Sequence, residues 1–201
     1  MSHQKTMEKL NITIEQANDL VEKLATNPIT KLHLKETEVI MRSLAKRFNE
    51  DEEKWGIIGL LHDIDWDLTK NDNANHCLKC QQILKDAGAS NFLIETVVSH
   101  GYSNEMIPSL KDMKRTTLIQ HCLVAAETLT GLIIASALMT SDKKLASLSL
   151  HSLQKRFKTK KFSEKCNRDL ILECEKAGIQ IDEFLQIGLT SLQSIASKLG
   201  F

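Results

Sequence analysis

The stretch DEEKWGIIGLLHDIDWD (Asp51–Asp67) changes within a few residues from an apolar run to a cluster of polar groups. Its first residues are acidic, which the helix dipole favours in a first turn, and the apolar run that follows predicts a core helix. The run ends in the doublet His62-Asp63. Such a doublet is either a solvated helix end or part of a metal site, because imidazole nitrogens and carboxylate oxygens are common metal ligands.

The same helical periodicity continues through the chain. Apolar residues recur at steps of three and four, strand-like alternation is scarce, and only two prolines and eight glycines occur. The sequence therefore predicts an all-α fold. A capping box formed by Thr13 and Gln16 predicts the first helix start, and Ser90 predicts another N-cap. We expect helices over about residues 14–26, 29–48, 49–63, 75–88, 91–100 and 116–139, with two or three more after residue 145.

Composition limits the class of protein. The chain has 201 residues, 42% hydrophobic, with 26 basic and 26 acidic side chains. This size suits one compact domain, and the balanced charge argues against specific nucleic-acid binding. The polar amino terminus lacks a signal peptide, and the longest apolar stretch, Leu129–Met139, is shorter than the roughly 20 residues that span a bilayer. Five cysteines do not form an even disulfide framework. We expect a cytoplasmic protein without membrane contact.

Several ionisable residues lie on apolar helix faces. A single inward histidine is most often a satisfied core residue, but five such groups beside Asp63 are harder to accommodate. Each buried polar group costs on the order of 1–3 kcal/mol if it is unpaired. We therefore expect these side chains to pair with one another or to share a cation such as Zn, Fe or Mn. The five are His33, His62, His76, His100 and Glu127.

The segment HCLKC (His76–Cys80) contains a CxxC motif beside a histidine. Structural zinc sites usually combine two such motifs, and the other cysteines form no second one. We interpret Cys77 and Cys80 as two residues three positions apart on a helix.

The order of these residues resembles the HD superfamily of metal-dependent phosphohydrolases, whose ligands follow the pattern His…His-Asp…His…His…Asp. The likeness covers about residues 32–131. The segments HLKETEVIMRSLAKRF, EDEEKWGIIGLLHDIDWDLTK and AAETLTGLI are similar to a bacterial and archaeal subgroup of predicted HD hydrolases. The stretches KKLASLSLHSLQKRFKTKKF and GIQIDEFLQIGL are similar to the C-terminal helices of that subgroup.

The resemblance implies a single HD-type helical bundle over residues 1–201, with a metal-site core over about 29–137 and a C-terminal extension over about 145–201. It implies one or two divalent metal ions, which we expect to be Fe, Mn, Zn or Ni. The first would be bound by His33, His62, Asp63 and Glu127. The second would be bound by His76 and His100, with Asp63 bridging. Adjacent side chains on a straight helix diverge by about 100°, so the doublet is expected where the helix ends.

The implied activity is hydrolysis of a phosphoester or phosphoanhydride of a small molecule, with a nucleotide as one candidate, by a metal-activated water that Asp63 helps to orient. Two positions depart from the family pattern. Glu127 replaces the last aspartate, and Trp66 replaces a phosphate-binding lysine, for which Lys70 could substitute. Asp65 and Asp67 would either orient the histidines or form a solvated helix end.

Two alternatives remain open. Some HD proteins are di-iron oxygenases, and the same six ligands suit that role. Alternatively, Glu127 and the missing lysine mark a degenerate HD domain that binds a ligand without turning it over. The sequence indicates neither the substrate nor the oligomeric state.

Overall fold

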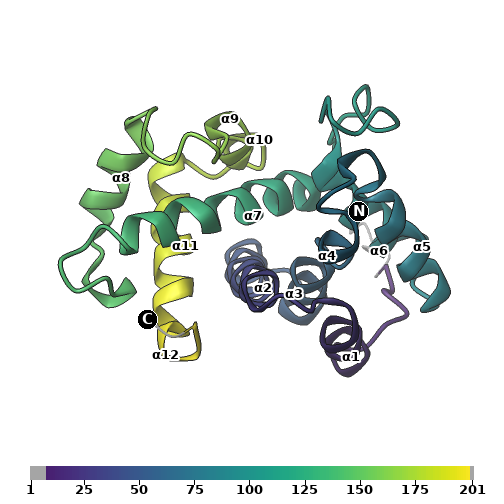
Figure 1. Ribbon diagram of the computed structural model, residues 1–201. Helices are drawn as coiled ribbons and strands as arrows, with labels where there is room; N and C mark the ends of the chain where they lie inside the picture. The colour runs from purple at the N-terminus through teal and green to yellow at the C-terminus, as the bar shows by residue number, and fades with distance from the viewer. Residues whose placement is uncertain (1–7, 200–201) are drawn as a thin grey trace, which may run out of the picture.

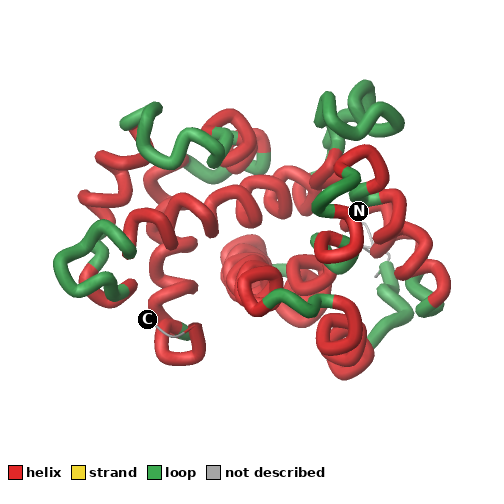
Figure 2. The backbone as a smooth tube through the Cα atoms, viewed as in Figure 1, coloured by secondary structure: helices red, strands yellow, loops and turns green. Residues whose placement is uncertain are grey.

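Two long helices, α2 (Pro28–Phe48) and α7 (Leu118–Ala137), organise the fold, and α3 (Glu52–Leu61) packs along α2. The computed structural model describes residues 8–199, which contain helices and loops but no strand (Figure 2). The all-α prediction is confirmed.

The remaining elements are shorter. Those before α7 are α1 (Ile14–Leu24), α4 (Trp66–Thr69), η1 (Asn73–Asn75), α5 (Leu78–Asp86), α6 (Asn91–Val98) and η2 (Ser99–Gly101). Those after it are η3 (Leu145–Ser147), α8 (Leu150–Lys158), α9 (Arg168–Ile171), α10 (Glu173–Lys176), α11 (Ile181–Ser194) and α12 (Ala196–Leu199). Figure 1 shows α4, α5 and α6 toward one end of α7 and α8 and α11 toward the other, with α9 and α10 alongside it between them.

Local sequence determines where several helices begin. The capping box predicted at Thr13 and Gln16 is present, and the Ser90 hydroxyl accepts a hydrogen bond from the Leu93 amide at 3.2 Å. Asp51 caps α3 in the same way through the Lys54 amide. These side chains satisfy backbone amides that have no partner inside the helix. The predicted starts of α1 and α6 are thus confirmed, whereas α3 begins three residues later than the predicted residue 49.

The helix predicted over about residues 75–88 starts later than expected, at Leu78. His76 has an extended backbone, and Cys77 has a φ of 67° in the left-handed region, which an α-helix cannot continue. The prediction that His76 lies on an apolar helix face was therefore wrong. His76 instead lies in the loop between η1 and α5.

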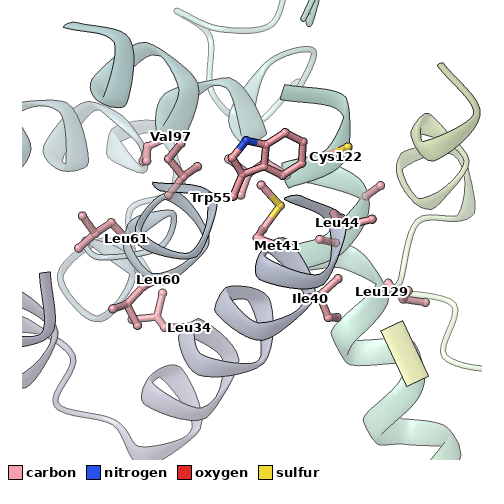
Figure 3. Close-up of a cluster of buried hydrophobic side chains, with 14 of the residues drawn as sticks. Leu34, Ile40, Met41, Leu44, Trp55, Leu60, Leu61, Val97, Cys122 and Leu129 are labelled. Carbon is pink, nitrogen blue, oxygen red and sulfur yellow. The ribbon is translucent and has the colours of Figure 1, made fainter. Parts of the chain in front are cut away.

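The hydrophobic core joins α2, α3 and α7 (Figure 3). Leu34, Met41 and Leu44 of α2 are fully buried, as are Leu61 of α3 and Leu129 of α7. Removing such side chains from water supplies most of the free energy that holds helices together. Ile29, in the first turn of α2, lies outside this core and is 73% exposed.

Helix α7 is the one described helix with the length and apolar composition to cross a membrane. About two thirds of its apolar window (67%) is buried inside the protein, as in the core helix of a soluble protein. Burial by neighbouring helices thus accounts for its composition, which is compatible with the expected absence of membrane contact. Cytoplasmic localisation stays a prediction.

A buried ion pair connects the C-terminal helices to the loop after α6. The Arg115 guanidinium donates to both carboxylate oxygens of Glu173 on α10, at 2.8 and 3.0 Å. It also donates to the backbone carbonyls of Ser99 and Tyr102, at 3.0 and 2.8 Å. His100 lies between those two carbonyls in the chain. Residues after about 145 therefore help to hold the loop that carries His100.

This pair predicts a pH-dependent stability. Burial raises the pKa of Glu173, but hydrogen bonds from Arg115 and His121 lower it to about 2. A carboxyl with a depressed pKa stabilises the fold above its unfolded pKa near 4.5 and loses that contribution as pH falls toward 2. We expect Glu173→Gln to lower the free energy of unfolding by about 2–3 kcal/mol at pH 7.

Urea denaturation of both proteins between pH 7 and the lowest pH at which they stay folded measures this difference. The difference should shrink below pH 4.5. Glu175→Gln, an exposed change on the same helix, is the control and should have little effect at any pH. A difference for Glu173→Gln that does not vary with pH would contradict the assigned ionic role.

Candidate metal centre

The close approach of α2 and α3 brings the first two histidines together. A Cβ added to Gly59 would lie 2.9 Å from the Thr37 carbonyl oxygen, so only glycine permits this spacing. The short connection between α2 and α3 makes the two helices antiparallel. His33 lies one turn before Thr37 on α2 and His62 lies one turn after Gly59, so the two histidines face each other. Their Nε2 atoms are 3.0 Å apart. The helix ends at Leu61, two residues before the predicted end at Asp63, and the Asp63 side chain lies in the same region.

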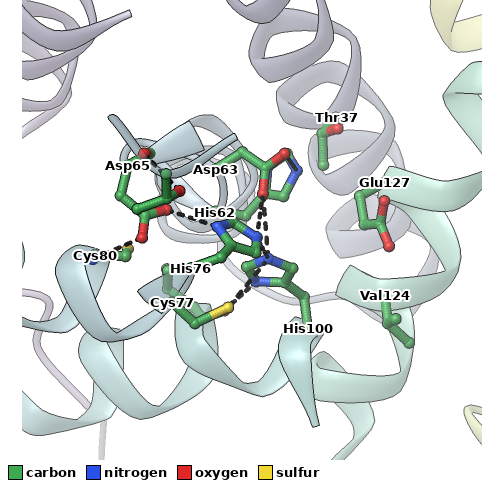
Figure 4. Close-up of polar contacts among 12 residues, drawn as sticks. Thr37, His62, Asp63, Asp65, His76, Cys77, Cys80, His100, Val124 and Glu127 are labelled. Carbon is green, nitrogen blue, oxygen red and sulfur yellow. Dashed lines mark hydrogen bonds and ion pairs between the residues drawn. The ribbon is translucent and has the colours of Figure 1, made fainter. Parts of the chain in front are cut away.

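Asp63 lies between two pairs of histidines (Figure 4). Its Oδ2 atom is 3.7 Å from the Nε2 atoms of His33 and His62. Its Oδ1 atom is 3.3 and 3.2 Å from the Nε2 atoms of His76 and His100. The Nε2 atoms of that second pair are 3.1 Å apart. Each carboxylate oxygen thus faces its own pair of imidazoles.

The outward nitrogen of every one of these imidazoles has an oxygen partner. The Nδ1 contacts are His33 with Thr130 Oγ1 at 3.0 Å, His62 with the Gly59 carbonyl at 2.8 Å, His76 with Asp65 Oδ1 at 3.0 Å, and His100 with the Val97 carbonyl at 2.6 Å. The Thr130 hydroxyl donates its single hydrogen to the Glu127 carbonyl, so it accepts from His33. All four partners accept a hydrogen bond, so each ring carries a proton on Nδ1 and directs its Nε2 atom away from that partner.

This hydrogen bonding directs the four Nε2 atoms toward one another in two pairs. Two lone pairs at about 3 Å repel unless a proton or a metal ion lies between them. Metal-binding histidines in proteins show the same arrangement, with the distal ring nitrogen donating to a carbonyl or carboxylate. The residues therefore fit a cation at each pair, with Asp63 able to contact both.

Two groups of described side chains have the spacing to hold a metal ion. The first group is His33, His62 and Glu127, and the second group is His76, Cys77 and His100. Within each group the potential ligand atoms lie within 4.8 Å of one another. The structure thus brings together all six residues predicted from the sequence and adds Cys77.

Glu127 is the most loosely placed of the six. It lies half-buried on α7, and no hydrogen bond joins it to either histidine of the first group. Its Oε1 atom instead accepts a hydrogen bond from the Thr128 hydroxyl at 2.6 Å. Burial raises the pKa of the Glu127 carboxyl, so a nearby cation would favour its ionised form.

Burial and mutual charge determine the protonation of the cluster. Burial lowers the pKa of His62 to about 3, so this imidazole is neutral at pH 7. Burial raises the pKa of Asp63, but the electrostatic interaction with His62 and hydrogen bonds from His100 and His76 hold it well below its usual range. Burial lowers the pKa of His76 and His100, but contacts with Asp63 and Cys77 raise it, so a bound metal ion would take the place of their Nε2 protons. An ionised carboxylate and a neutral imidazole are the forms that bind metal ions.

The aspartates that follow the doublet have different roles. Asp65 is fully buried; it accepts a hydrogen bond from His76 and, through Oδ2, one from the Cys80 amide at 3.0 Å. It orients His76, as one of the two predicted possibilities stated. Asp67 instead accepts hydrogen bonds from the Asn27 amide and the Thr30 hydroxyl and so supports the start of α2.

Neither Trp66 nor Lys70 supplies a free cation beside these histidines. The Trp66 ring packs edge-on against His76, with ring centroids 5.3 Å apart. The Lys70 ammonium, expected as a substitute, lies 3.7 Å from Asp67. Because Asp67 contacts Asn27 and Thr30, Lys70 lies beside the start of α2.

Sequence reasoning missed Cys77 and Thr130. Cys77 was assigned to a helix together with Cys80, although its position next to His76 was a usable signal. Its sulfur lies 3.6 Å from His100 Nε2. Thr130 carried no signal, because its contact with His33 joins residues 97 positions apart.

The different contacts of Asp65 and Asp67 predict different effects of equivalent substitutions. Asp65→Asn removes the charge that fixes the His76 ring, so we expect the affinity for metal to fall by roughly 10- to 100-fold. Asp67→Asn should lower the free energy of unfolding and leave metal affinity within about twofold, since it does not contact a histidine of either group. Metal titration and urea denaturation measure the two effects. Equal metal affinity in the two variants would contradict the role assigned to Asp65.

Comparisons of this chain with protein-family models, with curated proteins and with solved structures found no match. Membership of the HD superfamily therefore stays a prediction from the sequence motifs. The coarser conclusion follows from the geometry itself: buried His, Cys, Asp and Glu side chains of this all-helical protein could hold a metal ion.

Proposed function

We propose that this protein binds two divalent transition-metal ions and hydrolyses a phosphoester or phosphoanhydride of a small molecule. The observation that carries the proposal is the position of Asp63, whose two oxygens face two separate pairs of histidine nitrogens. A carboxylate shared between two neighbouring ions is a feature that suits two-metal hydrolysis. The order of the ligands in the sequence supports the same class of reaction.

His33, His62 and Glu127 would hold one ion, His76 and His100 the other, and Asp63 both. When bound, such ions lower the pKa of water and neutralise charge on phosphoryl oxygens. Asp63, ionised and held between the pairs, is also the group that can orient a water molecule by accepting its hydrogen. Thr130, Asp65 and the carbonyls of Gly59 and Val97 keep the imidazole rings in orientation.

The substrate would approach from the side of the first group. The His33 side chain is 27% exposed, whereas those of His76 and His100 are 10% and 7% exposed and that of His62 is fully buried. Since Lys70 pairs with Asp67, the binding of a phosphate at this site would depend on the ions themselves. Activity should accordingly be lost on chelation and restored by added metal.

The first experiment is elemental analysis of the purified, tag-free protein, followed by a screen of nucleotides and other phosphoesters with the metal that is found. Phosphate release that requires the metal supports the proposal. Iron with dioxygen uptake and no phosphate release would instead assign a di-iron oxygenase. Ligand binding without turnover, unaffected by His62→Ala, would assign a binding module.

Removal of a central ligand should abolish metal retention. We expect His62→Ala and Asp63→Ala each to lose the bound metal and all hydrolysis while the helical circular dichroism persists, since both residues lie at a helix end. His151→Ala, which changes an exposed histidine of α8, is the matched control and should keep both. Unchanged metal content in the two site variants would refute the site.

Shortening Glu127, the most loosely placed of the six residues, should affect metal retention less than removal of His62 or Asp63. Glu127→Asp restores the residue type of the family pattern, so we expect the variant to retain metal, with hydrolysis equal to or above that of the parent protein. Metal content and initial rates compare the two. Complete loss of metal would show that Glu127 has another role.

A further inference from the structure

We infer that Cys77 is a ligand of the second ion, so that His76, His100, Asp63 Oδ1 and the Cys77 sulfur form a four-donor site with mixed nitrogen, oxygen and sulfur ligands. This inference rests on the proposed two-metal centre and deepens it. It distinguishes the two positions chemically: the first has only nitrogen and oxygen donors, and the second includes a thiolate.

The spacing of the donor atoms matches a tetrahedral ion. With Zn–S of about 2.3 Å and Zn–N of about 2.0–2.1 Å, a tetrahedron has sulfur–nitrogen edges of about 3.6 Å and nitrogen–nitrogen edges of about 3.4 Å. The Cys77 sulfur lies 3.6 Å from His100 Nε2, and the two Nε2 atoms are 3.1 Å apart. Asp63 Oδ1 lies 3.2 and 3.3 Å from the same nitrogens. These four separations are close to tetrahedral edges, and the potential ligand atoms of His76, Cys77 and His100 all lie within 4.8 Å of one another.

The backbone holds the sulfur in this position. Cys77 is fully buried, and its φ of 67° turns the residue out of α5 and toward His100 (Figure 4). Gly101 leaves the space that the sulfur occupies, because a Cβ there would lie 2.6 Å from it. A left-handed conformation at a residue other than glycine costs of order 1 kcal/mol or more, so the surrounding structure maintains it.

The neighbouring cysteine does not share this role. The Cys80 sulfur is directed to the Leu61 carbonyl oxygen, 3.9 Å away, and only its backbone amide contacts Asp65. The CxxC motif therefore does not act as a pair of thiolates. Cys80 is consequently a matched control: it is buried, three residues away, and not turned toward the second pair of histidines.

The two positions would differ in chemistry and access. Four protein donors close a tetrahedral site, whereas hydrolytic metal sites keep a position open for water or substrate. The buried second position would thus be the permanently occupied one, and the more exposed first position would face the substrate. A thiolate also favours zinc or iron over manganese and magnesium, since soft ligands prefer these metals.

Cobalt(II) replacement tests the inference without measuring activity. Cobalt added to the metal-free, full-length protein should give a near-ultraviolet sulfur-to-cobalt charge-transfer band together with visible bands. Cys77→Ser should lose the charge-transfer band. It should also weaken zinc binding at one of the two positions by at least roughly 10- to 100-fold, which is the loss expected when only a hydrogen-bonding partner of a metal ligand is removed. Cys80→Ser should retain both.

X-ray absorption of the zinc-loaded parent protein provides a measurement that does not depend on how a variant folds. A sulfur neighbour at about 2.3 Å supports the inference. Bound zinc and cobalt with visible bands but without sulfur scattering or a charge-transfer band would overturn the role of Cys77 and leave the proposed centre intact. If neither metal binds, both the inference and the proposed function fail.

Discussion

The packing of α3 on α2 at Gly59 is the constraint on which the candidate site depends. The missing Cβ allows the two antiparallel helices to approach at the Thr37 carbonyl. One turn further along, this approach places His33 opposite His62 with 3.0 Å between ring nitrogens. A wider separation would still bury the apolar faces of both helices, but it would move the two imidazoles out of reach of one ion.

The end of α3 supplies the second feature of the site, the Asp63 carboxylate, which has a pair of histidines on each side. The helix ends at Leu61, His62 faces His33, and the Asp63 carboxylate reaches the second pair of histidines. That pair comes from non-helical backbone: His76 follows η1, and His100 lies in a 3₁₀ turn. Loops can direct side chains in ways that a regular helix face cannot, and outer hydrogen bonds then fix the rings.

The remainder of the chain supports this arrangement from a distance. Arg115 holds the carbonyls on either side of His100 and is itself held by Glu173 of the C-terminal helices. An arginine with five directional donors can organise a loop in this way when a carboxylate compensates its charge. The residues after α7 therefore contribute to the geometry of the site, although they provide no ligand to either group.

The sequence by itself determined the helical class, several helix starts and the six residues His33, His62, Asp63, His76, His100 and Glu127 that the structure brings together. Helical periodicity and capping are local, and the order of the histidines is a pattern along the chain, so both can be read without coordinates. Only the tertiary structure decided that Asp63 faces two histidine pairs, that Thr130 and Asp65 orient the rings, and that Cys77 leaves the helix toward His100. These features depend on the close approach of α2 and α3 and on one left-handed residue, and neither leaves a periodic signal in the sequence.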